Sequence, residues 1–208
     1  MLFRSIHEYL RRFAGDRTVN QTRELLAERL MELYRANRSA DWIWFESSLT
    51  YANASLPHAL LLCGQWIPNP PMMEAALETL TWLADRQRAK AGHFIPIGSQ
   101  GFYPRGGERA RFDQQPIEAQ AMVSACLEAY RATGDQRWRE EARRTFDWFL
   151  GYNDLGLPLY DPTTGGCRDG LHPDRTNENQ GAESTLAFLY SLLELHLSEN
   201  ILRVTDGG

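Results

Sequence analysis

Long polar loops and short turns alternate along this sequence, and the alternation limits the folds that it can adopt. Three loops rich in polar and aromatic residues, at about 38–55, 90–115 and 152–180, each lead into an apolar, helix-like segment. The connections at the opposite ends of these segments are short, such as Ala132-Thr133-Gly134-Asp135. In an array of helical hairpins, the end that carries the long loops usually carries the binding site.

Helical periodicity divides six segments of the chain into two kinds. The amphipathic segments, each with one apolar stripe, cover residues about 20–37, 71–89 and 137–150. The others are apolar on most faces, which indicates burial on more than one side, and they cover residues about 56–63, 116–132 and 182–197. Sustained period-two alternation is absent from the sequence, although residues 94–97 could form a short strand. We therefore expect one all-α domain over residues 1–208, with inner helices covered by outer ones.

Two short stretches repeat the same helix–turn–helix pattern. Residues 9–17 and residues 130–137 each end an apolar helix with a glycine and place an aspartate before the next helix. Glycine suits the left-handed conformation that closes a helix, and aspartate is a favourable N-cap. The sequence thus predicts helical hairpins with tight turns at Gly15-Asp16 and Gly134-Asp135.

Charge and cysteine content argue against several classes of protein. The net charge of −5 gives no basic footprint for nucleic acid, and no apolar run is long enough to span a membrane. Residues 1–8 mix charged and apolar side chains, unlike a secretory signal. The cysteines are widely spaced and show no metal-ligand pattern. We expect Cys63 and Cys126 in the core, no metal or other cofactor, and a reducing, cytoplasmic setting.

Ionisable residues lie near the start of all three inner helices. Pro57 and Pro116 fit the first helical position, where a missing N–H costs nothing. Aligning these starts with that of the third inner helix places His58, Glu118 and Glu183 in the first turns. If the inner helices pack side by side, we expect these side chains and the long loops to meet at one mouth.

Three longer motifs lie in or next to the long loops. They are Asp41-Trp42-Ile43-Trp44-Phe45-Glu46, the stretch YPRGGERARFDQQP at residues 103–116, and Asn177-Glu178-Asn179-Gln180-Gly181-Ala182-Glu183-Ser184. In these motifs and in the turn at residues 130–135, the chain resembles six-hairpin (α/α)6-toroid carbohydrate enzymes. More specifically, it resembles the toroid domain fused to, or encoded near, bacterial family 4-type glycosyltransferases. The resemblance runs from about residue 20 onward.

The resemblance implies an (α/α) helical-hairpin toroid that binds a carbohydrate ligand at its loop end. A ring of six hairpins has twelve helices, whereas this chain supplies about seven. We therefore expect an incomplete toroid that corresponds to the later part of a ring. A glycosyltransferase, or self-association of the chain, is the expected way to complete the toroid, because an open ring exposes apolar flanks.

The second long loop and its surroundings carry residues that suit acid–base chemistry on sugars. Asp113 or Glu118 can pair with Glu183 as acid and base, provided that their environments separate the two pKa values. Arg105 and Arg109 supply fork-shaped donors that position a substrate. The alternative is that these arginines and carboxylates brace one another as salt bridges, with Glu118 stabilising the start of its helix.

Two other groups supply candidate contacts to a glycan. Trp44 and Glu46 offer an aromatic face and a carboxylate, although Trp44 can equally anchor its loop in the core. The third long loop offers hydrogen-bonding side chains at Asp169, His172, Asn177 and Asn179. Carboxylates with one histidine are a weak signal for a metal, and hydrogen bonds to hydroxyl groups or to the loop's own turns suit these residues better.

Three hypotheses about function follow from these features. The first is a glycosidase-like domain that binds and processes a glycan through carboxylates at the mouth. The second is a non-catalytic carbohydrate-binding or scaffold domain associated with a glycosyltransferase. The third is a sugar epimerase on a similar toroid, with His58 as an acid or base. The fold alone cannot choose among them. Loss of glycan turnover on changing Glu118 separates the first from the second, and sugar interconversion without a new reducing end indicates the third.

Overall fold

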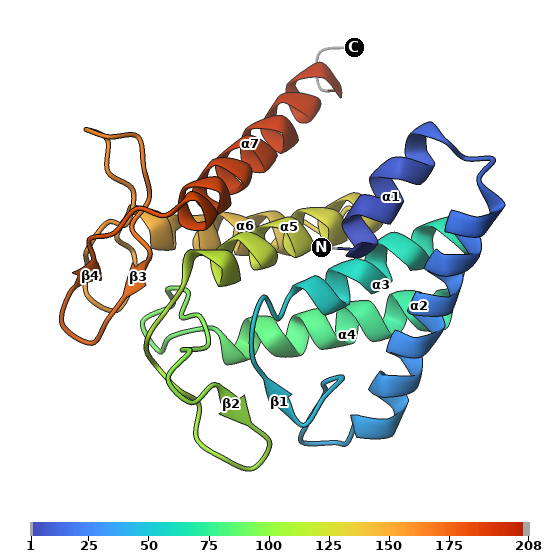
Figure 1. Ribbon diagram of the computed structural model, residues 1–208, viewed down its shortest axis with the longest axis horizontal. Helices are drawn as coiled ribbons and strands as arrows, with labels where there is room; N and C mark the ends of the chain where they lie inside the picture. The colour runs from blue at the N-terminus through green and yellow to red at the C-terminus, as the bar shows by residue number, and fades with distance from the viewer. Residues whose placement is uncertain (1, 206–208) are drawn as a thin grey trace.

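The computed structural model of the chain describes residues 2–205, and it describes the side chains of residues 5–199. Within this part the chain forms seven α-helices (Figure 1). They are α1 (Leu2–Arg12), α2 (Arg17–Asn37), α3 (Ser55–Trp66), α4 (Pro70–Arg86), α5 (Pro116–Thr133), α6 (Arg137–Phe146) and α7 (Ala182–Thr205). A 3-10 helix, η1 (Asp147–Leu150), continues α6. The expectation of a mostly helical chain with about seven helices is confirmed.

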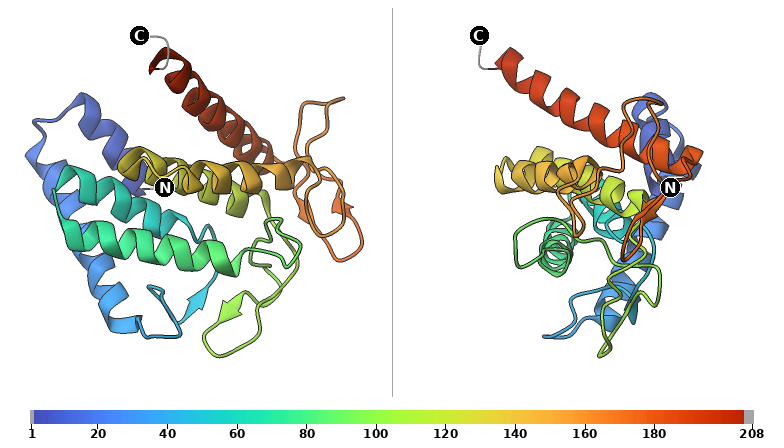
Figure 2. Two further views of the ribbon diagram at one scale, coloured as in Figure 1. Left: turned by 180° about the vertical axis from the view of Figure 1, so that it is seen from behind. Right: turned by 90° about the vertical axis from the view of Figure 1, so that its left-hand side faces the viewer.

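Helices α3, α5 and α7 lie in one row, with α5 between the other two. Helix α4 packs against α3, and α6 packs against α5, so each pair is a hairpin joined by a short turn (Figure 1). Helix α2 packs on α3 and α4, and α1 contacts α2 and α3. Figure 2 shows that α7 diverges from α5 and α6 toward its C-terminal end. Among the segments that are apolar on most faces, α3 and α5 are covered by neighbouring helices, as the alternation predicts.

The helix ends explain why the hairpins form where the sequence predicts them. Helix α5 ends at Thr133 and is capped by Gly134, whose φ of 70° is the left-handed conformation that favours glycine. Asp16 caps α2 by accepting a hydrogen bond of 3.0 Å from the amide of Val19. Asp135 accepts a hydrogen bond of 3.0 Å from the amide two residues later, at the start of α6. Both aspartates thus pair a backbone N–H that has no partner within its helix.

Three local expectations are wrong. Gly15 does not adopt a positive φ, so the first hairpin turn closes without the left-handed residue of the second. Helix α3 begins at Ser55, so Pro57 lies inside the first turn and not at the first position. Residues 94–97 form no strand, because Phe94 makes only an isolated bridge with Arg88.

The long loops gather at one end of the hairpins, and the short turns lie at the other end (Figure 1). The loops contain four short strands, β1 (Ser48–Leu49), β2 (Tyr103–Pro104), β3 (Gly170–Leu171) and β4 (Thr176–Asn177). Strand β1 pairs antiparallel with β2, and β3 pairs antiparallel with β4. Gln114 and Leu171 exchange two backbone hydrogen bonds of 3.0 and 2.9 Å. The second long loop is therefore tied to both of the others.

The core fills the space between the helix layers and continues under the loops. Trp44 of the first loop is completely buried and stacks on Trp82 of α4, with ring centroids 6.0 Å apart. Trp148 of η1 is completely buried as well. Cys63 and Cys126 are buried free thiols, which confirms their expected place in the core.

Helix α7 packs on one side only, although it is apolar on most faces. Its exposed apolar side chains are Leu186, Leu189, Tyr190, Leu192, Leu193 and Leu197. The expectation that neighbours bury α7 on more than one side is therefore wrong for the described part of the chain, in which α7 packs mainly on α5 and more lightly on α6. Among the described helices, none combines the length and the apolar character needed to cross a membrane.

Candidate functional site at the loop end

A cleft of about 650 Å³ opens at the loop end, between the starts of α3 and α5. Its walls come from the turn after β1, from the first turns of α3 and from the side of α5. The polar and aromatic residues that line it include Glu46, Thr50, Tyr51, Asn53, His58 and Gln120. Leu56, Leu62 and Ile117 supply apolar surface. Such a mixture fits a ligand that presents both hydroxyl groups and apolar faces.

The cleft collects some of the residues predicted to contact a glycan. Glu46 and His58 line it. Trp44 is completely buried and does not reach it. Of the two roles considered for Trp44, the structure therefore shows the anchor of its loop in the core and not the contact to a ligand.

Glu118 lies behind the wall of the cleft. Its side chain is buried, with 3% of the residue exposed. Oε2 accepts hydrogen bonds from the side-chain amide of Asn53 at 3.0 Å and from the backbone amide of Asn53 at 3.4 Å. Oε1 accepts a hydrogen bond from the amide of Ala52. Burial raises the pKa of Glu118 to about 7, against the opposing effect of these N–H donors. Both carboxylate oxygens are thus occupied by the turn at residues 50–53.

That turn has an uncommon backbone conformation. Ala52 has a φ of 49°, in the left-handed region that alanine rarely adopts. The side chain of Asn53 closes the turn, because it accepts a hydrogen bond of 2.8 Å from the amide of Thr50 and donates one of 3.3 Å to the carbonyl of Thr50. Tyr51 lies at the tip of the turn and is half exposed.

Tyr51 links the cleft to α7. Its hydroxyl donates a hydrogen bond of 2.8 Å to Oε2 of Glu183. Burial and this hydrogen bond raise the pKa of Tyr51 to about 12, and the nearby carboxylate of Glu118 acts in the same direction. Two of the predicted carboxylates therefore approach the same tyrosine, one buried on α5 and one exposed on α7.

Asp113 and His172 form a separate pair at the loop end. The carboxylate of Asp113 is bonded to Nδ1 of His172, and its second oxygen accepts a hydrogen bond of 3.1 Å from the side chain of Gln100. The side chains of His172 and Asp113 are 24% and 23% exposed. With Nδ1 engaged, Nε2 is the ring nitrogen of His172 that another group could contact.

Arg105 and Arg109 brace the ends of two helices. Arg105 donates a hydrogen bond of 3.1 Å to the carbonyl of Asn37, the last residue of α2. Arg109 donates to the carbonyl of Arg86, the last residue of α4. The last carbonyls of a helix have no partner within it, and an arginine is well suited to bind them. Both arginines thus have a structural role, but through backbone carbonyls and not through the salt bridges with the candidate acid–base carboxylates that the sequence suggested as the alternative to substrate binding.

Asp169, Asn177 and Asn179 build the entry to α7. Asp169 accepts a hydrogen bond of 2.8 Å from the amide of Gly181 and another from the side chain of Asn179. The side chain of Asn177 accepts one of 3.1 Å from the amide of Asn179. These contacts fix the first turn of α7, which carries Glu183.

Sequence reasoning missed Asp154, which is the buried charge at the centre of the loop end. Its side chain is 2% exposed. The carboxylate accepts hydrogen bonds from Arg111 at 2.9 and 3.1 Å and from Gln114 at 2.8 Å. Nε2 of His93 lies 3.0 Å from its Oδ1. Burial by itself would raise the pKa of Asp154, but these partners outweigh it and lower the pKa. In the sequence, Asn153-Asp154-Leu155-Gly156 has only the composition of a turn.

Gln120 was also missed as a site residue. Its signal in the sequence is a polar side chain within an inner helix that is otherwise largely apolar. It lies on the same side of α5 as Ile117, Ala121 and Ser124, which line the cleft as well. Its side chain donates a hydrogen bond of 2.8 Å to Ser124.

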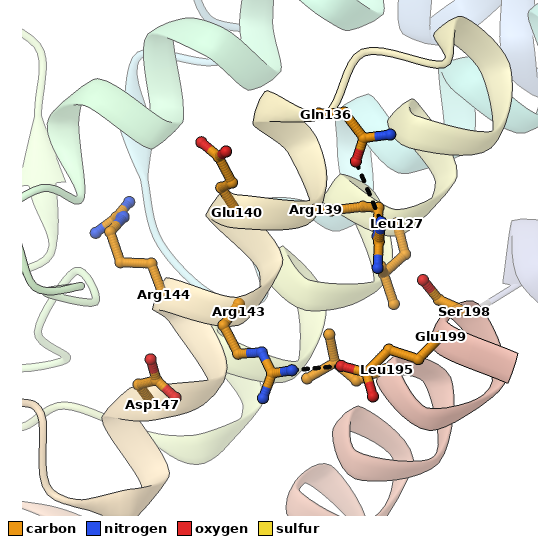
Figure 3. Close-up of a pocket in the computed structure, with 10 residues that line it drawn as sticks. All are labelled: Leu127, Gln136, Arg139, Glu140, Arg143, Arg144, Asp147, Leu195, Ser198 and Glu199. Atoms are coloured by element: carbon orange, nitrogen blue, oxygen red, sulfur yellow. Dashed lines mark hydrogen bonds and ion pairs between the residues drawn. The ribbon is translucent and has the colours of Figure 1, made fainter. Parts of the chain in front are cut away.

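A second groove, of about 530 Å³, lies between α5, α6 and α7 (Figure 3). Arg139 and Arg143 flank it, but Arg139 is bonded to Gln136 and Arg143 to Glu199. The groove contains none of the residues predicted for the site, and its arginines are balanced by acidic side chains. We therefore place the candidate site in the cleft at the loop end.

Neither a metal-binding cluster nor a matching protein family assigns a function to this cleft. Among the described residues, no three histidine, cysteine, aspartate or glutamate side chains are grouped so as to hold a metal ion. No protein-family model and no curated protein matches the chain.

Proposed function

We propose that the chain is a carbohydrate-active domain that binds a glycan in the cleft between α3 and α5. The observation that carries this proposal is the composition of the cleft, where the ring of Tyr51 is accompanied by Glu46, His58 and Gln120. Sugars present apolar C–H faces to aromatic rings, and their hydroxyl edges bind amides, imidazoles and carboxylates. The resemblance of the loop motifs to toroid carbohydrate enzymes supports the same class of ligand.

Glycan processing at this mouth, in a glycosidase-like reaction, would use the carboxylates that water reaches. Glu183 is exposed and bonded to Tyr51, which supports an acid–base role in contact with the ligand. Asp113 with His172 is a second proton-transfer group, because its imidazole is oriented by a carboxylate and partly exposed. Glu118, the third predicted carboxylate, is buried and has both oxygens occupied, which does not support a direct chemical role.

We further propose that the hairpins belong to an (α/α) toroid. The pairs α3–α4 and α5–α6 are consecutive hairpins with adjacent inner helices, which supports a repeating ring architecture. The exposed leucines of α7 support a partner on that flank, a glycosyltransferase or a second copy of the chain. Cys63, Cys126 and Cys167 are free thiols, which supports a reducing, cytoplasmic compartment.

Glycan binding can be tested by calorimetry against a panel of defined oligosaccharides. For the oligosaccharide that binds best, Tyr51→Ala should weaken the affinity by roughly tenfold, because a stacked aromatic ring is lost. Gln120→Ala should weaken it as well, through the loss of a hydrogen bond to a hydroxyl group. Tyr152→Ala is the matched control, since Tyr152 is 69% exposed and lies outside the residues that line the cleft. Equal losses in the control, or a panel without any binder, would contradict the proposal.

Processing can be tested separately by measuring new reducing ends. Glu183→Gln keeps the size of the side chain and removes its titratable proton, so turnover should fall by roughly two to four powers of ten while binding persists. Unchanged turnover in this variant would exclude Glu183 as the acid or base.

A non-catalytic scaffold domain is a second candidate function, and one observation favours it. Several exposed leucines lie together on α7, and an apolar face of this kind is typical of a protein–protein interaction surface. Binding without any turnover, together with association through α7, would favour the scaffold function. Interconversion of sugars without a new reducing end would point instead to an epimerase.

A further inference from the structure

Glu118 carries an arrangement that the proposed function does not use. It is a buried carboxylate that binds only the turn at residues 50–53, and that turn carries Tyr51. We propose that Glu118 is a positioning residue that sets the direction of Tyr51 through the left-handed Ala52. The inference deepens the proposed function, because it says how the aromatic wall of the cleft is held in place.

The contacts of Glu118 leave it no route to a ligand. The residue is 3% exposed, and it is separated from the cleft by the turn itself. Oε1 accepts from the amide of Ala52, and Oε2 accepts from both N–H groups of Asn53. A carboxylate that accepts several N–H groups in a dry environment is held firmly in one geometry. Glu118 therefore acts on the site through the backbone.

Ala52 is the point at which this action is needed. Its φ of 49° lies in the left-handed region, which is unfavourable for an L-residue with a Cβ atom. Such a conformation persists only when the surrounding structure determines it. The amide of Ala52 points to Glu118, so the hydrogen bond opposes the intrinsic preference of alanine for negative φ. Loss of that bond should let the backbone relax.

A relaxed Ala52 would move its neighbour. Tyr51 precedes Ala52 directly, and its hydroxyl reaches Glu183 at 2.8 Å. A rotation of the backbone at Ala52 redirects the Tyr51 side chain, so the hydrogen bond to Glu183 breaks and the cleft loses its aromatic wall. The chain of contacts thus runs from α5 through the turn to α7.

Few other titratable groups act on this arrangement. Tyr51, in the turn, interacts with the carboxylates of both Glu118 and Glu183. From α3, His58 lines the cleft but interacts with Glu128, further along α5. Glu128 is also buried, so it provides a matched control for the loss of a buried glutamate on the same helix.

The test is a titration of Tyr51 by NMR on protein labelled with carbon-13 in the tyrosine rings. Burial and the hydrogen bond to Glu183 raise the pKa of Tyr51 to about 12, against an ordinary value of about 10. In the unchanged protein, the Tyr51 signal should still be that of the protonated ring at about pH 11. In Glu118→Gln, one acceptor oxygen becomes an NH2 group that faces the N–H donors of the turn, so the turn should be displaced. The midpoint should then fall toward about 10, because Tyr51 no longer reaches Glu183. In Glu128→Gln, the Tyr51 signal should be unchanged.

Rescue at Ala52 separates positioning from other effects of Glu118. The charge of Glu118 also raises the pKa of Tyr51 directly, so its removal alone lowers the midpoint somewhat. Adding Ala52→Gly to Glu118→Gln removes the cost of the left-handed conformation, and it should restore a large part of the lost shift. A direct charge effect, or a general loss of stability, would not respond to glycine at this position.

Two results with the variants would overturn the inference. One is a Tyr51 midpoint that stays high in folded Glu118→Gln. The other is a midpoint that falls but is not restored by Ala52→Gly.

If Glu118→Gln does not fold, the unchanged protein decides the question: the amide proton signal of Ala52 should shift with a midpoint near the pKa of about 7 that burial gives Glu118. An Ala52 amide that does not respond between about pH 5 and pH 9 overturns the inference as well. None of these measurements needs a glycan, so a failure to find a ligand is distinguishable from a failure here.

Discussion

The carboxylate of Asp113 is bonded to Nδ1 of His172, and this contact joins the loop before α5 to the β3–β4 hairpin. The neighbouring residues Gln114 and Leu171 exchange two backbone hydrogen bonds. The amide of His172 donates a further hydrogen bond of 2.8 Å to the carbonyl of Arg175. The backbone of His172 is therefore held within its hairpin, and its imidazole is held at Nδ1 by the carboxylate of Asp113, a contact that favours one tautomer of the ring.

We predict that this pair contributes to turnover if the domain processes glycans. Asp113→Asn keeps the size of the side chain but no longer stabilises a protonated imidazole, so turnover should fall by roughly two powers of ten or more. His172→Gln should have a similar effect, and the double variant should be little worse than either single one, because the two residues act as a unit. The measurement is the rate of appearance of new reducing ends. Full turnover in both single variants would remove the pair from the mechanism.

Asp154 should be the most sensitive charged residue of the loop end. Asp154→Asn removes the negative charge that Arg111 and the other partners of this buried carboxylate bind. We expect the free energy of unfolding to fall by about 3 kcal/mol. The pKa of Asp154 is lowered in the folded protein, so its contribution is present above the unfolded value of about 3.8 and is lost as the pH falls through the folded value. Urea unfolding should show a difference between the two proteins that narrows in acid. A difference independent of pH would mean that the charge of Asp154 is not what stabilises the loops.

Glu118 should have the opposite dependence on pH. Its pKa is raised from 4.5 to about 7 by burial, so its contribution to stability is fully present below about 4.5 and is lost as the pH rises to about 7. A shift of this size corresponds to about 3 kcal/mol. The measured quantity is the free energy of unfolding of the unchanged protein minus that of Glu118→Gln. This difference should decrease by about the same amount between acid and neutral pH. A difference that stays constant over this range would show that Glu118 is not a buried carboxyl group.

The helices could be predicted because their signals are local. The signals are the apolar spacing along α2, the glycine at residue 134, the aspartate that caps α2 and the aspartate that accepts from the first amide of α6. Each of them acts within a few residues. The inner and outer layers follow from how many faces of each segment are apolar. Helix α7 is the exception. Its sequence shows that most of its faces are apolar, but it does not show which surface, if any, covers them.

The contacts of the site could not be predicted, because they join residues far apart in the sequence. Glu118 binds Ala52 across 66 positions, and Asp113 binds His172 across 59. The motifs lie in or next to loops that meet at one end of the helices, but a motif does not say which carboxylate is bonded to the backbone and which is exposed. Arg105 and Arg109 show the same limit, since an arginine that binds a helix end has the same local sequence as one that binds a substrate.

The exposed face of α7 should control the association of the chain. Leu186, Leu189, Leu193 and Leu197 follow one side of the helix at spacings of three and four residues, and all are between 39% and 57% exposed. Leu189→Glu combined with Leu193→Glu places charges in the middle of this face, so that apolar contact with a partner would require their desolvation. We predict that sedimentation velocity shows concentration-dependent association of the unchanged chain and a monomer for the double variant. Leu25→Glu with Leu33→Glu on α2, where both leucines are also about half exposed, is the matched control and should leave association largely unchanged. If the unchanged chain remains a monomer at all concentrations, then α7 does not bind a second copy, and its apolar face would be the place to look for a different protein partner.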